Sequence, residues 1–127
     1  MPEDYESAAI RHFEDATALR LSGRFDNAGH LVGFAAECAI KSRIRALRPA
    51  NDAPHGHLPD LLIAARKHLG PRSNYTQMYD LLKPDTFSGW HVNRRYQATG
   101  ATTEQEVAKW FKLTSRLLVT AGLRARK

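Results

Sequence analysis

Residues 23–44 read GRFDNAGHLVGFAAECAIKSRI and carry the pattern on which the fold depends. Asp26 is a good N-cap residue and Pro49 stands where a helix must end, so the stretch predicts a long helix over about residues 26–47. Several of its positions carry small side chains, which allow another helix to approach closely, within a bundle or across a subunit boundary. These positions are Gly29, Gly33, Ala36 and Ala39. The stretch is therefore interpreted as a packing seam.

The segments on either side of this seam also have helical periodicity, and Pro or Gly residues separate one segment from the next. The other expected helices span about residues 3–22, 58–69, 73–83 and 103–121. The last has the clearest amphipathic pattern, and Thr103 and Glu106 have the spacing of a capping box at its start. No segment alternates with the period of a strand. We expect one domain, residues 1–127, folded as an all-α, up-and-down bundle of four to five helices.

The composition is that of a folded soluble protein. Of the 127 residues, 43% are hydrophobic and 25% are charged, and no run approaches the roughly 18 apolar residues of a membrane span. The N-terminus begins with acidic residues, whereas a secretory signal begins with basic ones. The single cysteine cannot form an intrachain disulfide. These features predict a cytoplasmic protein without membrane contact.

The chain is basic, with 19 Lys and Arg residues against 13 Asp and Glu residues and a net charge of +6. Much of the excess lies in clusters, namely Arg43, Arg45 and Arg48, then Arg94 and Arg95, then Arg124, Arg126 and Lys127. Such charge attracts nucleic acid phosphates or an acidic protein partner. The alternative is that the clusters are solvated helix ends, because cations are favourable near the negative end of the helix dipole.

Several short motifs, in their order and spacing, resemble those of the HEPN domain family across nearly the whole chain. The motifs are Gly23-Arg24-Phe25, Ala28, Ala35-Ala36-Glu37, Ile40-Lys41, the HLPDLL stretch at residues 57–62, and Arg95-Tyr96. The resemblance implies a helical bundle that pairs as a homodimer, and one of two functions. Many members are metal-independent endoribonucleases that place an Arg-x4-6-His motif in a cleft between two copies. Others lack the motif and bind nucleotidyltransferase-type partners, as in toxin–antitoxin pairs.

Ribonuclease chemistry of this kind requires a histidine to move a proton and an arginine to hold the phosphate. Arg24 and His30 have the spacing of the motif. They lie at the start of the second expected helix, however, whereas the family's pair lies late in the chain, and Phe25 stands where a polar residue often follows the arginine. The alternative is that Arg24 ends the first helix and that His30 lies on the flank of the second.

The part of the chain where the family's motif would lie reads WHVNRRYQ over residues 90–97, and no histidine follows its arginines. The motif in its usual order is therefore absent, although these residues can still form an RNA-phosphate site in three dimensions. The candidates are His91, Arg94 and Arg95 for catalysis, and Asn93 and Tyr96 for binding. Alternatively, Trp90 and Tyr96 anchor the loop, and the arginines form ion pairs with carboxylates.

Glu37 lies on an otherwise apolar helix face, where a buried carboxylate needs a partner or a raised pKa. We expect an ion pair between Glu37 and the Arg94-Arg95 turn, with a general base as the less favoured role. Glu37 is therefore a candidate binding residue for that turn. Cys38 lies on the buried stripe of the same helix and is interpreted as a small core residue.

Metal and cofactor binding are not expected. His55 and His57 would supply half of a metal site, but no further ligand cluster stands at the required spacing, so we interpret them as part of a loop and cap. The chain also lacks a phosphate-binding loop, a dinucleotide fingerprint and a nucleophile elbow. The sequence favours a dimeric RNA- or partner-binding component of a toxin–antitoxin or defence-type system, with a metal-independent endoribonuclease as the alternative.

Overall fold

The computed structural model describes residues 4–47, 56–58, 60–69, 76–83 and 86–123, and within these residues the chain forms helices and no strand. The elements are α1 (Tyr5–Leu21), α2 (Phe25–Leu47), α3 (Asp60–Leu69), α4 (Thr76–Leu81), the 3-10 helix η1 (Val92–Tyr96) and α5 (Glu104–Thr120). The predicted all-α bundle is confirmed. Each predicted helix is present within a few residues of its expected bounds.

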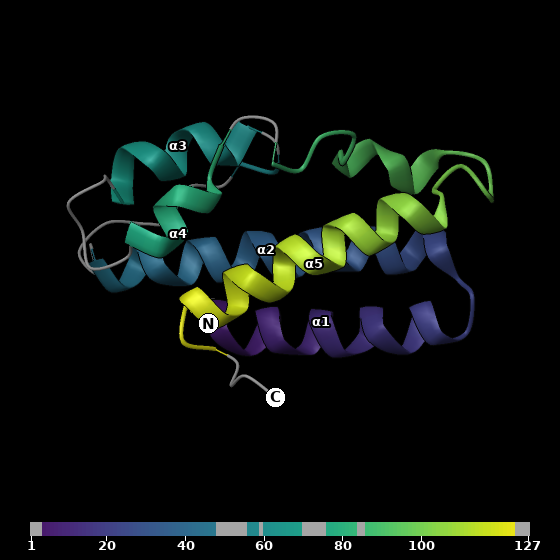
Figure 1. Ribbon diagram of the computed structural model, residues 1–127, viewed down its shortest axis with the longest axis horizontal. Helices are drawn as coiled ribbons and strands as arrows, with labels where there is room; N and C mark the ends of the chain where they lie inside the picture. The colour runs from purple at the N-terminus through teal and green to yellow at the C-terminus, as the bar shows by residue number, and fades with distance from the viewer. Residues whose placement is uncertain (1–3, 48–55, 59, 70–75, 84–85, 124–127) are drawn as a thin grey trace.

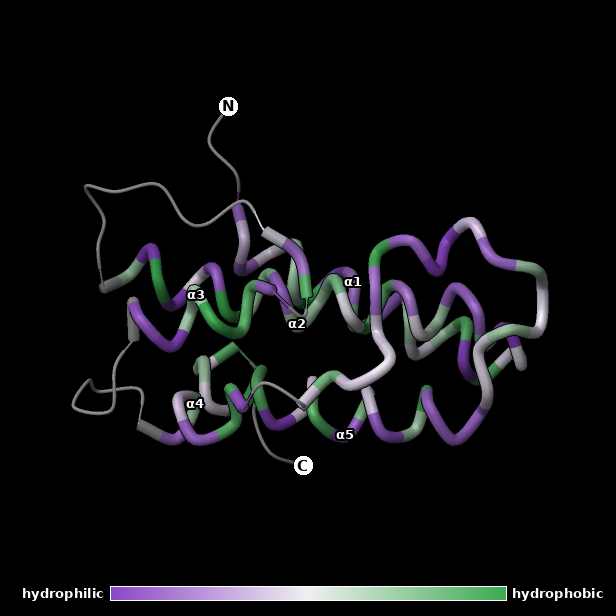
Figure 2. The backbone as a smooth tube through the Cα atoms, turned by 90° about the horizontal axis from the view of Figure 1, so that it is seen from above, coloured by the Kyte–Doolittle hydropathy of each residue, from purple (hydrophilic) through white to green (hydrophobic). Residues whose placement is uncertain are grey.

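The two other long helices, α1 and α5, both pack along α2 (Figure 1). α1 and α2 are joined by a tight turn and run in opposite directions. α3 packs on one half of α2 and η1 on the other, so the segment from α3 to η1 brings the chain back to the end where α2 begins. α5 then runs beside α2 in the same direction. Seen from above, α4 lies beside α5 and α3 lies beside α2 (Figure 2).

The ends of the outer helices follow local sequence rules. The Asp4 carboxylate accepts a hydrogen bond from Ser7 N at 2.9 Å and caps α1. At α5 the predicted capping box is present, because Thr103 Oγ1 accepts from Glu106 N and Glu106 Oε1 accepts from Thr103 N, both at 3.1 Å. Gly23 follows α1 with a φ of 75°, a conformation that favours glycine.

The stretch on α2 is a packing seam, but at Gly29 and Gly33 the indole rings of Trp110 and Trp90 fill it, where close approach of another helix was expected. A Cβ atom added to Gly33 would lie 2.0 Å from the Trp90 ring, and Trp90 Nε1 donates a hydrogen bond to Gly29 O at 2.9 Å. A residue without a side chain leaves room for this approach. α2 therefore anchors the segment between α4 and η1, and this anchor sets the position of the candidate site.

α5 closes the bundle through its predicted apolar face. Its buried residues are Val107, Trp110, Phe111, Thr114, Leu117 and Leu118. Thr114 Oγ1 donates a hydrogen bond to Val32 O at 3.3 Å, and the rings of Phe13 and Phe111 lie 5.5 Å apart at their centres. These contacts join α1, α2 and α5 into one core. Among the helices described, none is long and apolar enough to cross a membrane.

Candidate functional site

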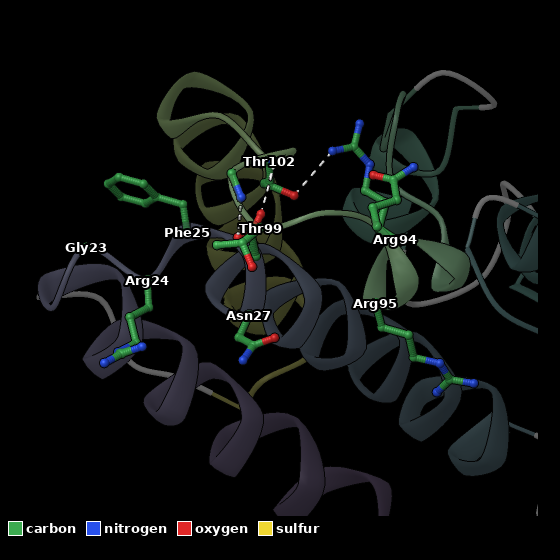
Figure 3. A pocket seen from close by; sticks show the side chains of 11 residues that line it. Gly23, Arg24, Phe25, Asn27, Arg94, Arg95, Thr99 and Thr102 are labelled. Atoms are coloured by element: carbon green, nitrogen blue, oxygen red, sulfur yellow. Dashed lines mark hydrogen bonds between the residues drawn. The ribbon is translucent and has the colours of Figure 1, made fainter.

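A pocket of about 410 Å³ lies at the end of the bundle where α2 begins. It is lined on one side by residues 23–27, at the turn from α1 into α2, and on the other by side chains of η1 and of the loop that leads to α5 (Figure 3). Arg24, Arg94 and Arg95 are among the lining residues, so we call it the basic pocket. The structure therefore brings together three arginines that the sequence separates into two groups.

Asp26 holds the loop between η1 and α5 against α2. Its carboxylate oxygens accept hydrogen bonds from Gly100 N at 2.8 Å and from Thr102 N at 3.1 Å. The bond from Gly100, and then the bond from Thr102, lower the pKa of Asp26. Gly100 has a φ of 92°, a conformation that suits glycine. Asp26, predicted as the N-cap of α2, lies instead in its first turn and fixes a wall of the basic pocket.

Arg94 is part of the framework of this pocket. Its Nη2 atom lies 2.8 Å from Glu106 Oε2, and its Nε atom donates to Gly89 O at 2.8 Å. Its Nη1 atom also reaches Thr102 Oγ1 at 3.3 Å (Figure 3). Partial burial raises the pKa of Glu106, but hydrogen bonds from Thr103 and Arg94 bring it below its ordinary value. Arg94 thus joins η1 to the first turn of α5 and is not a free phosphate ligand.

Arg24 and Arg95 are exposed, and neither forms an ion pair with a carboxylate of the described chain. Their side chains extend in different directions from the rim of the basic pocket (Figure 3). The Arg95 guanidinium lies over the ring of Tyr96, 5.0 Å from its centre, and Tyr96 is 75% exposed. The rim of the pocket therefore carries charge that is free to meet an anionic ligand.

His30 lies about one turn beyond the pocket, on a face of α2 that also includes Phe34. Its ring stacks on Trp90 with the ring centres 5.7 Å apart, and it meets the edge of Phe34 at 4.6 Å. Its Nδ1 atom is buried and has no hydrogen-bond partner among the described residues. Burial lowers the pKa of His30, and the charges of Arg95 and His57 lower it further. His30 is therefore largely a neutral imidazole at neutral pH.

The other sequence candidates of residues 90–97 lie outside the lining of the basic pocket. His91 is exposed and caps η1, because its Nδ1 atom accepts a hydrogen bond from Asn93 N at 3.1 Å. The structure thus gives His91 and Asn93 a local role in the 3-10 helix. Arg24 and His30, which have the spacing of the motif, lie at the same end of α2, but no hydrogen bond joins their side chains in the described structure.

Glu37 is buried, but the predicted ion pair with the Arg94-Arg95 turn is wrong. Its Oε1 atom accepts a hydrogen bond from Leu58 N at 2.8 Å, and its Oε2 atom lies 3.1 Å from His57 Nδ1. The ion pair does not form because the arginine turn and Glu37 lie at different positions along α2. The arginine turn packs where α2 begins, whereas Glu37 lies about three turns further along, next to the segment that enters α3.

His57 is the candidate that the sequence analysis missed. Its carbonyl oxygen accepts from Leu61 N at 2.8 Å, which confirms the predicted cap, but its half-exposed side chain was not linked to Glu37. The sequence did indicate that the buried Glu37 carboxylate needs a partner. It did not indicate that this partner is His57, because the two residues stand 20 positions apart in the chain. Burial raises the pKa of Glu37, and the contacts with Leu58 and His57 oppose this effect.

Cys38 is poorly suited to act as a nucleophile. It is partly buried, and burial followed by the Glu37 carboxylate raises the pKa of its thiol to about 11. The thiolate fraction at neutral pH is therefore very small. Within the residues that the structure describes, no group of three His, Cys, Asp or Glu side chains is placed to hold a metal ion. His55, predicted to lie in a loop, falls outside the described residues.

Comparison of the chain with models of known protein families, with curated proteins and with solved structures finds no match. The resemblance to HEPN domains therefore stays a prediction, and the site is interpreted from its own geometry. The basic pocket carries two exposed arginines, whereas the neutral His30 and the half-exposed His57, which contacts the buried Glu37 carboxylate, lie outside its lining. Such groups can hold an anion and exchange protons.

Proposed function

We propose that the protein is a HEPN-like, dimeric RNA-binding component of a toxin–antitoxin or defence-type system, and that the basic pocket binds RNA phosphates. The observation that carries this proposal is the pair Arg24 and Arg95, whose charges no carboxylate of the described chain neutralises by an ion pair. A guanidinium group can bind phosphate through two parallel hydrogen bonds, and the release of counterions from RNA favours the contact.

The groups near the two arginines suit a ribose–phosphate chain. Asn27, Gln97 and Thr99 line the same pocket and offer neutral hydrogen-bond donors and acceptors. Contacts of this kind bind sugar hydroxyls and phosphate oxygens and fix the position of a nucleic acid. Because Arg24 and Arg95 diverge, they suit an extended polyanion better than a single small anion. The net charge of +6 attracts such a ligand over longer distances.

The test is the binding of a short single-stranded RNA as a function of salt, measured by fluorescence anisotropy. Arg24→Ala and Arg95→Ala should each weaken binding and reduce the slope of log affinity against log salt by about 0.7, the value for one lost contact with a single strand. Lys109→Ala and Lys112→Ala remove the same charge from the exposed face of α5 and are the matched control. If the arginine variants and the lysine variants lose the same RNA affinity, then overall charge, and not the basic pocket, binds RNA.

Binding to an acidic partner protein is the second form of this function. The same exposed arginines would contact the acidic surface of a nucleotidyltransferase-type partner, and the lack of a histidine after Arg95 favours a binding role over the motif's ribonuclease role. In this case the wild-type protein would not bind RNA. A partner would copurify when the native operon is expressed, and the double substitution of Arg24 and Arg95 by Ala would release it.

A further inference from the structure

The segment that enters η1 is held against α2 by Trp90. The Trp90 indole lies in the seam at Gly33, and its Nε1 atom donates a hydrogen bond to Gly29 O at 2.9 Å. Trp90 comes two residues before Val92, the first residue of η1. The position of η1 on the half of α2 where that helix begins therefore depends on this anchor (Figure 1).

The His30 ring is part of the anchor. It stacks on the Trp90 indole, with the ring planes 14° apart and the ring centres 5.7 Å apart. The Phe34 ring meets His30 edge to face at 4.6 Å and lies 5.8 Å from the indole, measured between centres. The three rings thus pack on one another, and we call them the ring cluster. His30 is its one member that can take up a proton.

The position of His30 in the ring cluster suits a neutral imidazole better than an imidazolium. His30 Nδ1 is buried and has no hydrogen-bond partner among the described residues. An imidazolium carries a hydrogen on both ring nitrogens, so protonation would leave a buried N–H donor without an acceptor. Such a group is costly to bury. The face of an indole attracts cations, but it cannot accept the hydrogen bond that this nitrogen would offer in the plane of the imidazole ring.

The charges around the ring cluster also oppose protonation of His30. Among the described residues, the titratable groups that contact the cluster or act on His30 by their charge are all basic. They are His12 of α1, His57 at the entry to α3, and Arg95 of η1. Carboxylates of the neighbouring elements act elsewhere, since Glu106 of α5 binds Arg94, Asp26 of α2 binds backbone N–H groups, and Asp15 of α1 acts on His12. The protonated ring would therefore lie among positive charges.

We propose that His30 is an acid-sensitive switch, in which neutral His30 holds Trp90 and η1 against α2 and protonated His30 releases them. Because Arg94 and Arg95 of η1 line the basic pocket, the switch controls the order of one wall of that pocket. The switch concerns the wall and not its ligand. It therefore goes beyond the proposed RNA binding, and its failure would leave that proposal unaffected.

The direction of the switch follows from the linkage between folding and protonation. Burial, and then the charges of Arg95 and His57, lower the pKa of His30 below its ordinary value of 6.5. The contribution of neutral His30 to the closed state is therefore fully present above pH 6.5 and is lost as the pH falls through the lower folded-state pKa. Between these two values, the equilibrium constant for release of Trp90 should rise by up to about tenfold for each unit of pH.

The test is hydrogen exchange of the Trp90 indole N–H, measured by NMR from about pH 7.5 to about pH 5, across the titration range of histidine. The rate is expressed as a protection factor, which removes the intrinsic effect of pH on exchange. Protection of Trp90 should fall in acid, while the backbone amide of Leu118, buried at the far end of α5, stays protected. Equal loss at both sites would show global unfolding, and stronger protection of Trp90 in acid would show that the indole retains the imidazolium. Either result would overturn the switch.

His30→Phe and His12→Phe form a matched pair of variants. His30→Phe keeps a ring between Trp90 and Phe34 that cannot take up a proton, so Trp90 should stay protected in acid. His12 is also partly buried, and burial lowers its pKa, but no ring contact joins it to Trp90 in the described structure. His12→Phe should therefore respond to acid like the wild type. If His30→Phe loses protection as the wild type does, the switch is wrong.

A titration of the wild-type protein tests the switch even where His30→Phe does not fold. The ring protons of His30 and the indole resonance of Trp90 should titrate with one shared midpoint, below pH 6.5, because the two rings move together. The rings of His12 and His57 are followed in the same spectra. A Trp90 resonance that follows either of those two rings, or that does not change with pH, would contradict the role of His30.

Discussion

At the scale of single residues, tertiary contacts decide which charged groups are free to act. Glu37 could be identified from the sequence as a carboxylate on an apolar face, and the structure confirms its burial. Its partner His57 could not, because the two meet only through the path of the chain between α2 and α3. Arg94 and Arg95 are neighbours in the chain, yet one is paired with Glu106 and the other is exposed. Residue type can be read from a sequence, whereas the partner depends on the fold.

Glu37 should make stability depend on pH in the direction opposite to that of most carboxylates. Burial raises its folded-state pKa above the ordinary value of 4.5, so its contribution to stability is fully present below that value and is lost as the pH rises through the folded-state pKa. Glu37→Gln removes this titration. The free energy of unfolding of the wild type, relative to Glu37→Gln, should fall as the pH rises through this window in urea titrations. A relative stability that rises with pH would show that His57 and Leu58 outweigh burial.

At the scale of elements, the long helices were predictable because their signals are local. The capping box joins Thr103 and Glu106, three residues apart, and Gly23 ends α1 by its own backbone conformation. The 3-10 helix η1 was not predicted, since residues 92–96 have no helical periodicity. It is held from outside, by Trp90 in the seam of α2 and by the ion pair of Arg94 with α5. An element stabilised by such distant contacts leaves no periodic pattern in its own residues.

The seam between α2 and Trp90 predicts a large effect from one methyl group. A Cβ at Gly33 would lie 2.0 Å from the Trp90 ring, so Gly33→Ala should displace the ring. We expect the free energy of unfolding to fall by about 1–3 kcal/mol, as in other overpacked cores, although alanine favours helix formation. Gly56→Ala is the control, because no atom of the described residues, apart from its chain neighbours, lies within 4 Å of its new Cβ. Urea titrations followed by tryptophan fluorescence measure the free energy of unfolding of both variants. If Gly33→Ala is as stable as Gly56→Ala, Trp90 does not pack in the seam.

At the scale of the whole molecule, α2 organises both the core and the candidate site. One of its faces receives Trp90 and the apolar residues of α5, and the all-α class followed from periodicity of this kind. Another face carries His30 and Phe34, with Arg95 near its beginning and His57 further along. The net charge was evident from composition, but it did not show which arginines are free. That distinction depends on where each carboxylate lies after folding.

A single-domain homodimer predicts the form of the unfolding curve. One core joins α1, α2 and α5, so the chain should unfold in one transition that circular dichroism and tryptophan fluorescence report alike. The proposed homodimer adds a second signature, because mass action raises the midpoint as protein concentration increases. Sedimentation should then find twice the mass of one chain. A midpoint independent of concentration, with the mass of one chain, would remove the dimer from the proposed function but leave the basic pocket, which a single chain builds by itself.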